Sequence, residues 1–290
     1  MATINKSIVL TALVPAARHD EAVFLKAVDR LASLGVNTIE YASPLNTAVR
    51  RGQLLSQRGL EGIFLAATFQ KEGQQNLASI SGETRAHAVA ACKEHVDAAI
   101  ASGAKGVLIT SGRYPDDPAK ASDAWQAFEE SLHALLNVTR GHIRLLLEPG
   151  DRTVDSMQLA GPSDEVLALV QRMNQPLSDF ALTMDISHIA QLGESLYPAL
   201  EKTAPFCDHV HLANCVLTPG DPLFGDKHPL FTHHGAHYHH QEIRDAATYL
   251  KEHTVHNRLT LALEVISREK DPFHVMERVI EEESWFFSKK

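Results

Sequence analysis

Cysteine is scarce in this sequence. The 290 residues include three, Cys92, Cys207 and Cys215, and their spacing fits neither a disulfide framework nor a cysteine-rich metal site. Disulfides persist in oxidising compartments, so a chain that does not rely on them suits a reducing one. We therefore expect a cytoplasmic protein.

The sequence also lacks an excess of positive charge and any long hydrophobic run. The formal net charge is −9 at pH 7, and no block of basic residues is present. We therefore expect neither nucleic acid nor a membrane as a partner. No apolar run approaches the ~18–20 residues of a membrane span. Hydrophobic residues make up 44% and charged residues 22%, a balance typical of a soluble globular protein with a substantial core.

Short apolar segments alternate with longer amphipathic ones along the whole chain. Parallel strands need a helix-length crossover, so this alternation predicts a parallel sheet. Eight such units in 290 residues, with no linker between them, favour a single (β/α)8 TIM barrel domain spanning residues 1–290. The expected strands are 7–13, 36–42, 62–69, 105–111, 143–148, 180–187, 208–214 and 259–266.

Helical periodicity is clearest in three of the segments between the strands. These are residues 20–35, 82–104 and 163–175, where apolar residues recur at helical spacing. Three connections are long and irregular, and long loops in a compact domain are usually functional. They span residues 71–80, 149–162 and 215–239.

Two of the apolar runs end abruptly in a carboxylate. Glu148 closes "IRLLLE" and Glu264 closes "LTLALE", while Asp185 and His211 stand near the ends of the two strands between them. In a TIM barrel the carboxyl ends of the strands form the active-site rim. Four successive strands therefore bring a metal-type ligand to the same rim.

Strand alternation aims these side chains inward. His211 shares a face with His209, opposite the aliphatic Val210 and Leu212, which can pack on helices. Three carboxylates that converge without a counter-charge repel one another, and a divalent cation removes that conflict. Two Glu, one Asp and one His form an oxygen-rich set that suits Mn²⁺, Mg²⁺ or Co²⁺ and also accommodates Zn²⁺. We expect one such ion.

These residues give the sequence a family resemblance. In order along the chain, "LLLEPG", "DISH", "VHLAN", "GDKH" and "LALEV" resemble the xylose isomerase-like TIM-barrel superfamily of sugar isomerases and epimerases, also called AP endonuclease family 2. The resemblance implies that Glu148, Asp185, His211 and Glu264 are the single-metal site of a ketose 3-epimerase. It also implies that His188 contacts the substrate.

The sequence departs from the family pattern at two places. Ketose epimerases tend to carry an arginine six residues after the strand-seven histidine, where this chain has Leu217. Endonuclease IV, the nuclease branch, uses three zinc ions and has histidines at the ends of strands three and four. We place Thr68 and Ser111 at those ends, so a full trinuclear cluster is not expected here.

Further residues near the rim are candidate substrate contacts. Asp226 and His228 begin a loop rich in histidine that also holds His233, His234, His237, His239 and His240. This loop is either a solvated polar segment or a lid in which Asp226 or His228 faces the substrate or a second ion. Arg113 and Arg152, which follow strands four and five, can grip a carboxylate or phosphate. Glu40 ends strand two and can bond a substrate hydroxyl.

The resemblance implies a metal-dependent isomerase or epimerase of a small hydroxy-carbonyl compound, such as a sugar, a sugar phosphate or a sugar acid. Glu148 and Glu264 are the expected acid/base pair, working through an enediolate. Two alternatives stay open: a lyase or dehydratase on the same scaffold, and a metal-dependent phosphodiesterase of the endonuclease IV type. Family members are commonly dimers or tetramers, so the resemblance also implies a homo-oligomer.

Overall fold

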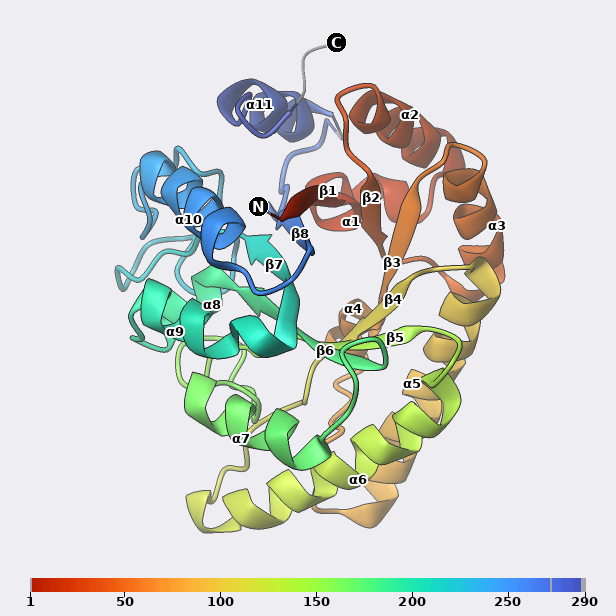
Figure 1. Cartoon of the computed structure of the whole chain (residues 1–290), viewed down its shortest axis with the longest axis vertical. Coiled ribbons are helices and arrows are strands. Elements are labelled where there is room, and N and C mark those ends of the chain that lie inside the picture. Colours follow the sequence, from red (N-terminus) through yellow and green to blue (C-terminus); the bar gives the residue numbers. More distant parts are fainter. Residues whose placement is uncertain (1, 272, 288–290) are drawn as a thin grey trace.

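The chain forms a closed barrel of eight parallel strands in consecutive order, and β1 pairs with β8 to complete it (Figure 1). The structure is a computed structural model that describes residues 2–271 and 273–287. This confirms the predicted (β/α)8 fold. The strands are β1 (Thr3–Val9), β2 (Thr38–Tyr41), β3 (Glu61–Leu65), β4 (Gly106–Ile109), β5 (Arg144–Leu147), β6 (Phe180–Asp185), β7 (Cys207–Leu212) and β8 (Arg258–Leu263).

Helices surround the strands on the outside of the barrel (Figure 1). The predicted helical segments correspond to α2, α5 and α7, and α5 closes on Gly103, whose φ of +75° suits glycine. The α-helices are α1 (Leu10–Leu13), α2 (Glu21–Ala32), α3 (Leu45–Ser56), α4 (Ala66–Glu72), α5 (Gly82–Ser102), α6 (Ala121–Thr139), α7 (Ser163–Met173), α8 (Ile186–Gln191), α9 (Leu196–Thr203), α10 (His240–His253) and α11 (His274–Glu282). Short 3₁₀ turns span Pro15–Arg18, Pro118–Lys120 and Ala204–Phe206.

The hydrophobic core lies mainly between the barrel and its helices. Val210 and Leu212 of β7 pack into this outer core, as strand alternation predicts. A smaller apolar cluster lies inside the barrel and includes Val9, Ile63, Leu108, Leu146 and Ala262. Other inward positions are polar, among them Ser7, Thr38 and His209, so the barrel axis is available for chemistry.

All eight predicted strands extend past the observed carboxyl ends, and three of them run into a helix. Residues 10–13 form α1, residues 66–69 belong to α4, and residues 186–187 begin α8. A short apolar run shows neither helical nor strand periodicity clearly. A buried helical turn directly after a strand is therefore easily predicted as a continuation of the strand. The correction matters for Thr68, which lies on α4 and not at the end of a strand.

None of the helices within residues 2–271 and 273–287 is both long and apolar enough to cross a membrane. The long irregular connections lie close to where the sequence predicts them. They follow α4, β5 and β7, and they meet at the carboxyl end of the barrel, where they surround a cavity.

Candidate metal centre

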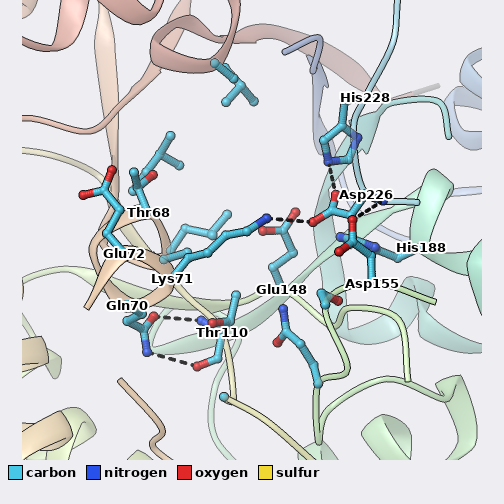
Figure 2. A pocket seen from close by; sticks show the side chains of 18 of the residues that line it. Thr68, Gln70, Lys71, Glu72, Thr110, Glu148, Asp155, His188, Asp226 and His228 are labelled. Carbon is cyan, nitrogen blue, oxygen red and sulfur yellow. Dashed lines mark hydrogen bonds and ion pairs between the residues drawn. The ribbon is translucent and has the colours of Figure 1, made fainter. Parts of the chain in front are cut away.

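A cavity of about 750 Å³ opens at the carboxyl ends of the strands. Its wall includes Leu65 at the end of β3, Glu148 just after β5, His211 of β7 and Glu264 just after β8. This is the rim at which TIM barrels hold their active sites. Figure 2 shows the cavity from close by.

The structure brings together the four predicted metal ligands, and three of them, Glu148, His211 and Glu264, line this cavity. One ligand atom from each of Glu148, Asp185, His211 and Glu264 lies within 4.8 Å of the others. His211 Nδ1 is 2.9 Å from Glu148 Oε1 and 2.8 Å from Glu264 Oε2. We call these four residues the quartet.

Strand pairing explains the convergence of the quartet. Asp185 and His211 are direct partners in the register between β6 and β7. Glu148 follows β5, and its amide donates to Ile109 O over 3.0 Å, while the Glu264 amide donates to Leu212 O over 3.1 Å. Each glutamate is therefore tied by its backbone to the neighbouring strand, and its side chain turns toward the axis.

Three atoms of the quartet are buried and make no hydrogen bond: Asp185 Oδ2, His211 Nδ1 and Glu264 Oε2. The last two lie 2.8 Å apart but are not aligned for a hydrogen bond. The other Asp185 oxygen accepts from the Ser187 amide over 2.7 Å and caps α8. Buried polar atoms are normally paired, so three orphans facing one point indicate a missing partner. An oxygen-rich set with one imidazole fits a divalent cation.

The charge around His211 supports the same interpretation. Burial lowers the pKa of His211, but the carboxylates of Glu40, Glu148 and Glu264 outweigh it and hold the pKa well above its ordinary value. The ring therefore lies where a positive charge is strongly favoured.

A second group of side chains lies beside the quartet and shares Asp185 with it. Ligand-type atoms of Asp185, His188 and His228 also lie within 4.8 Å of one another. His228 Nε2 is 2.7 Å from Asp226 Oδ1, and Figure 2 shows this pair next to His188. Burial lowers the pKa of His228, but Glu264, Asp226 and Asp185 raise it to about 10.

A family model described as a xylose isomerase-like TIM barrel matches residues 28–246. The chain belongs to this family. No curated protein sequence matches the chain.

Solved structures of family-like barrels superpose over nearly the whole chain. A D-tagatose 3-epimerase-like protein is 15% identical, with a TM-score of 0.70, and the match covers 97% of this chain and 98% of that one. A 3-keto-D-glucoside 4-epimerase from E. coli is 15% identical, with a TM-score of 0.66 and 99% of each chain covered. An AP endonuclease, family 2, from Brucella melitensis is 19% identical, with a TM-score of 0.64 and coverage of 96% and 99%.

Four of the expected substrate contacts line the cavity. They are His188, Asp226, His228 and Arg113. The side chain of Arg113 is 62% exposed and lies 3.5 Å from Asp116, so its guanidinium is accessible. His188 is buried, and its Nδ1 has no hydrogen-bond partner.

Two expected substrate contacts lie elsewhere, which corrects the sequence-based expectation. Arg152 donates to Gln158 O over 3.0 Å, to Leu159 O over 2.6 Å and to Glu165 Oε2 over 2.8 Å, so its guanidinium organises its own loop. Glu40 is fully buried behind His211, with both carboxylate oxygens engaged by neighbouring side chains. Neither residue is placed to bond a substrate in the cavity, because nearby groups already occupy their polar atoms.

The histidine-rich loop contributes little to the cavity wall. Of its histidines, His228 lines the cavity within the part of the chain that the structure describes. His239 and His240 begin α10, and His240 Nδ1 lies 2.9 Å from the buried Glu283. The loop is anchored by two buried side chains, Phe231 and Tyr238. The remaining histidines therefore have structural or surface positions.

Sequence reasoning missed Lys71 as a cavity residue. Its Nζ lies 3.1 Å from Asp226 Oδ2, and Figure 2 shows the side chain reaching across the cavity. The preceding residue, Gln70, accepts from the Thr110 amide over 3.0 Å and donates to Thr110 O over 3.2 Å, which fixes α4 against β4. The sequence held a weak signal, since Lys71 begins one of the long connections after a strand.

Proposed function

We propose that the protein is a divalent-metal-dependent isomerase or epimerase of a small hydroxy-carbonyl compound, such as a sugar or sugar acid. The convergence of Glu148, Asp185, His211 and Glu264 beside the cavity carries this proposal. The superposed D-tagatose 3-epimerase-like protein and 3-keto-D-glucoside 4-epimerase support it, because both have the same fold. The buried, unpaired thiols in the described residues suit a cytoplasmic protein.

The quartet would hold the ion, which supplies Lewis-acid polarisation of the substrate carbonyl when bound. Glu148 and Glu264 have side chains 13% and 14% exposed, so each keeps access to the cavity. One carboxylate removes the proton from the carbon that bears the substrate hydroxyl, giving an enediolate. The other glutamate, as the acid, returns a proton to the opposite face in epimerisation, or one of the two delivers it to the neighbouring carbon in isomerisation.

Two further residues would position the substrate. The His188 Nδ1 atom is buried without a partner and available to bond a substrate oxygen. The Lys71 side chain is 70% exposed, so its ammonium can turn from Asp226 to a substrate oxygen. The Asp226 carboxylate raises the pKa of Lys71 and keeps it cationic, which suits stabilisation of an oxygen that gains negative charge.

Proton exchange at carbon tests the proposed reaction. Candidate ketoses and keto-acids are turned over in D₂O by Mn²⁺-loaded enzyme, and the product should gain deuterium at the attacked carbon. Glu148→Gln and Glu264→Gln keep the side-chain size but remove the base, so each should lower turnover by ~10²-fold or more. Deuterium incorporation together with loss of water indicates the lyase alternative.

One observation favours a second candidate function. The cluster of Asp185, His188 and His228 beside the quartet offers ligands for a second cation, which a metal-dependent phosphodiesterase would use. Ser111 is not placed as a ligand, because its Oγ donates to Gly112 O and accepts from the Ala160 amide. About one metal ion per chain supports the isomerase. Two or more ions, with cleavage of a phosphodiester and no carbon-bound deuterium, support the phosphodiesterase.

A further inference from the structure

Glu40 lies on β2, one residue before its end, and its side chain is inside the barrel, on the side of His211 that faces away from the quartet. The side chain is fully buried. Its Oε1 accepts from Ser7 Oγ over 2.7 Å and lies 2.9 Å from His209 Nε2. Its Oε2 lies 3.0 Å from His211 Nε2. A single carboxylate therefore bridges two imidazole rings and a hydroxyl.

A carboxylate accepts hydrogen bonds and has no proton to donate. Both imidazoles must therefore carry a proton on the Nε2 atom that meets Glu40. In neutral His211 this arrangement leaves the lone pair on Nδ1, which is the atom that faces Glu148 and Glu264. The contact selects the tautomer in which His211 presents a ligand atom to the quartet.

His209 fixes the direction of the Glu40 carboxylate. It lies on β7 two residues before His211, on the same inward face, and it is buried. It takes one carboxylate oxygen while His211 takes the other, so the carboxylate plane cannot rotate without breaking a contact. Ser7 of β1 holds the same oxygen as His209 from another strand.

We propose that Glu40 is a positioning residue of the metal centre, which sets the tautomer and ring orientation of His211, and that His209 holds Glu40 in place. The inference rests on the proposed function, because it takes the quartet to be a metal site. Metal-binding histidines generally donate their second ring N–H to a carboxylate or carbonyl, and loss of that partner weakens metal binding.

Glu40, His209 and His211 also present ligand-type atoms close together. Hydrogen bonding explains their geometry better than direct coordination does. The two rings meet different oxygens of one carboxylate, at 2.9 and 3.0 Å, which are ordinary hydrogen-bond lengths. Coordination of a metal ion by Glu40, His209 and His211 themselves is the alternative, and the experiment below distinguishes it by the number of ions bound.

The test is Glu40→Gln, which keeps the size of the side chain but replaces one oxygen with an amide donor. One imidazole then loses its acceptor, so Mn²⁺ measured by calorimetry should bind ~10–100-fold more weakly than to the wild type. Glu201→Gln, the same change at an exposed position on α9, is the matched control. It should change the Mn²⁺ dissociation constant less than about threefold, because Glu201 is not part of the quartet or of the Glu40 contacts.

The tautomer of His211 can also be measured directly in the wild-type protein, so this test does not depend on whether a variant folds. In Zn²⁺-loaded protein, ¹⁵N NMR should show the His211 proton on Nε2, and a proton on Nδ1 overturns the inference. If the wild type binds one Mn²⁺ and Glu40→Gln binds it equally well, the positioning role is wrong and the proposed function stands. If the wild type binds no metal, the proposed function itself fails. Two ions per chain, one of them lost in Glu40→Gln, makes Glu40 a ligand and overturns the positioning role.

Discussion

The carboxylate of Asp155 accepts a hydrogen bond from the backbone amide of Asp226 over 3.1 Å. Its Oδ2 atom also lies 2.5 Å from Lys227 Nζ. Asp155 belongs to the connection after β5, and Asp226 to the connection after β7. The two longest loops at the rim are therefore joined beside the cavity, and Lys71 joins α4 to the same point through Asp226.

Removal of the Asp155 carboxylate should make the loop after β7 more mobile. In Asp155→Ala, amide hydrogen exchange in residues 217–228 should accelerate about fivefold, because one partly exposed charge-assisted contact is lost. Asp97→Ala, at an exposed position on α5, is the control and should leave that exchange unchanged. In the wild type, metal plus substrate should slow exchange across residues 217–240 if the loop acts as a lid. Equal exchange in all of these samples would leave the loop as a rigid wall.

Asp185→Asn should abolish stabilisation by metal. The amide keeps the cap on α8 through its oxygen, but it removes one negative charge from the quartet. Excess Mn²⁺ should raise the melting temperature of the wild type by several degrees, as expected for a ligand that binds only the folded state. The variant should show about a tenth of that response or less. Glu201→Gln, an exposed position on α9, should respond like the wild type.

Lys71→Met should impair turnover without affecting metal binding. The methionine keeps most of the side-chain length but cannot stabilise an oxygen that gains charge, so kcat/KM should fall by ~10–10²-fold. The Mn²⁺ dissociation constant should stay within about threefold of the wild type, because Lys71 is not part of the quartet. Lys251→Met on α10 is the control for loss of a surface lysine. A normal kcat/KM in Lys71→Met would remove Lys71 from the substrate site.

Asp151 should make stability depend on pH. Burial raises the pKa of this carboxyl, but hydrogen bonds from Ser156 and from the amides of Asp155, Ser156 and Val154 outweigh it and lower the pKa. A lowered pKa in the folded state stabilises the protein above the unfolded pKa of ~3.9, and the effect is lost as pH falls through the folded pKa. Asp151→Asn should therefore be less stable than the wild type at pH 7, and the difference in unfolding free energy should shrink below about pH 4. A difference that is constant with pH would contradict this account.

The fold and the quartet could be predicted because both depend on the pattern of apolar and polar residues within short segments. Alternation of apolar and amphipathic segments predicts the barrel, and period-two alternation aims His211 inward. The ends of strands were less predictable, since "LTAL" and "AATF" are apolar in either state and tertiary context makes them α1 and α4. Lys71 was missed for the same reason: it lies on α4, which the sequence pattern presents as the end of a strand and the start of an irregular loop, so the direction of its side chain could not be predicted.

The roles of Glu40 and Arg152 depend on contacts that sequence spacing does not reveal. Glu40 is placed at a strand end, as predicted, but its partners lie 33 and 169 residues away at Ser7 and His209. Arg152 is placed after β5, as predicted, but the fold of its own loop directs the guanidinium away from the cavity. Strand order locates a residue at the rim, whereas neighbours from other strands decide which way its polar atoms point.

The barrel separates the residues that serve chemistry from those that serve stability. The former lie along the axis, and the latter form a layer around the strands. Asn5, Thr38 and His209 lie inside the barrel below the quartet, whereas most aliphatic residues pack between the strands and the helices. Changes to the outer shell should therefore alter resistance to heat and denaturant, and changes along the axis should alter chemistry. An engineer can repack the helix-facing layer for robustness and leave the reacting centre untouched, or retune that centre on an unchanged scaffold.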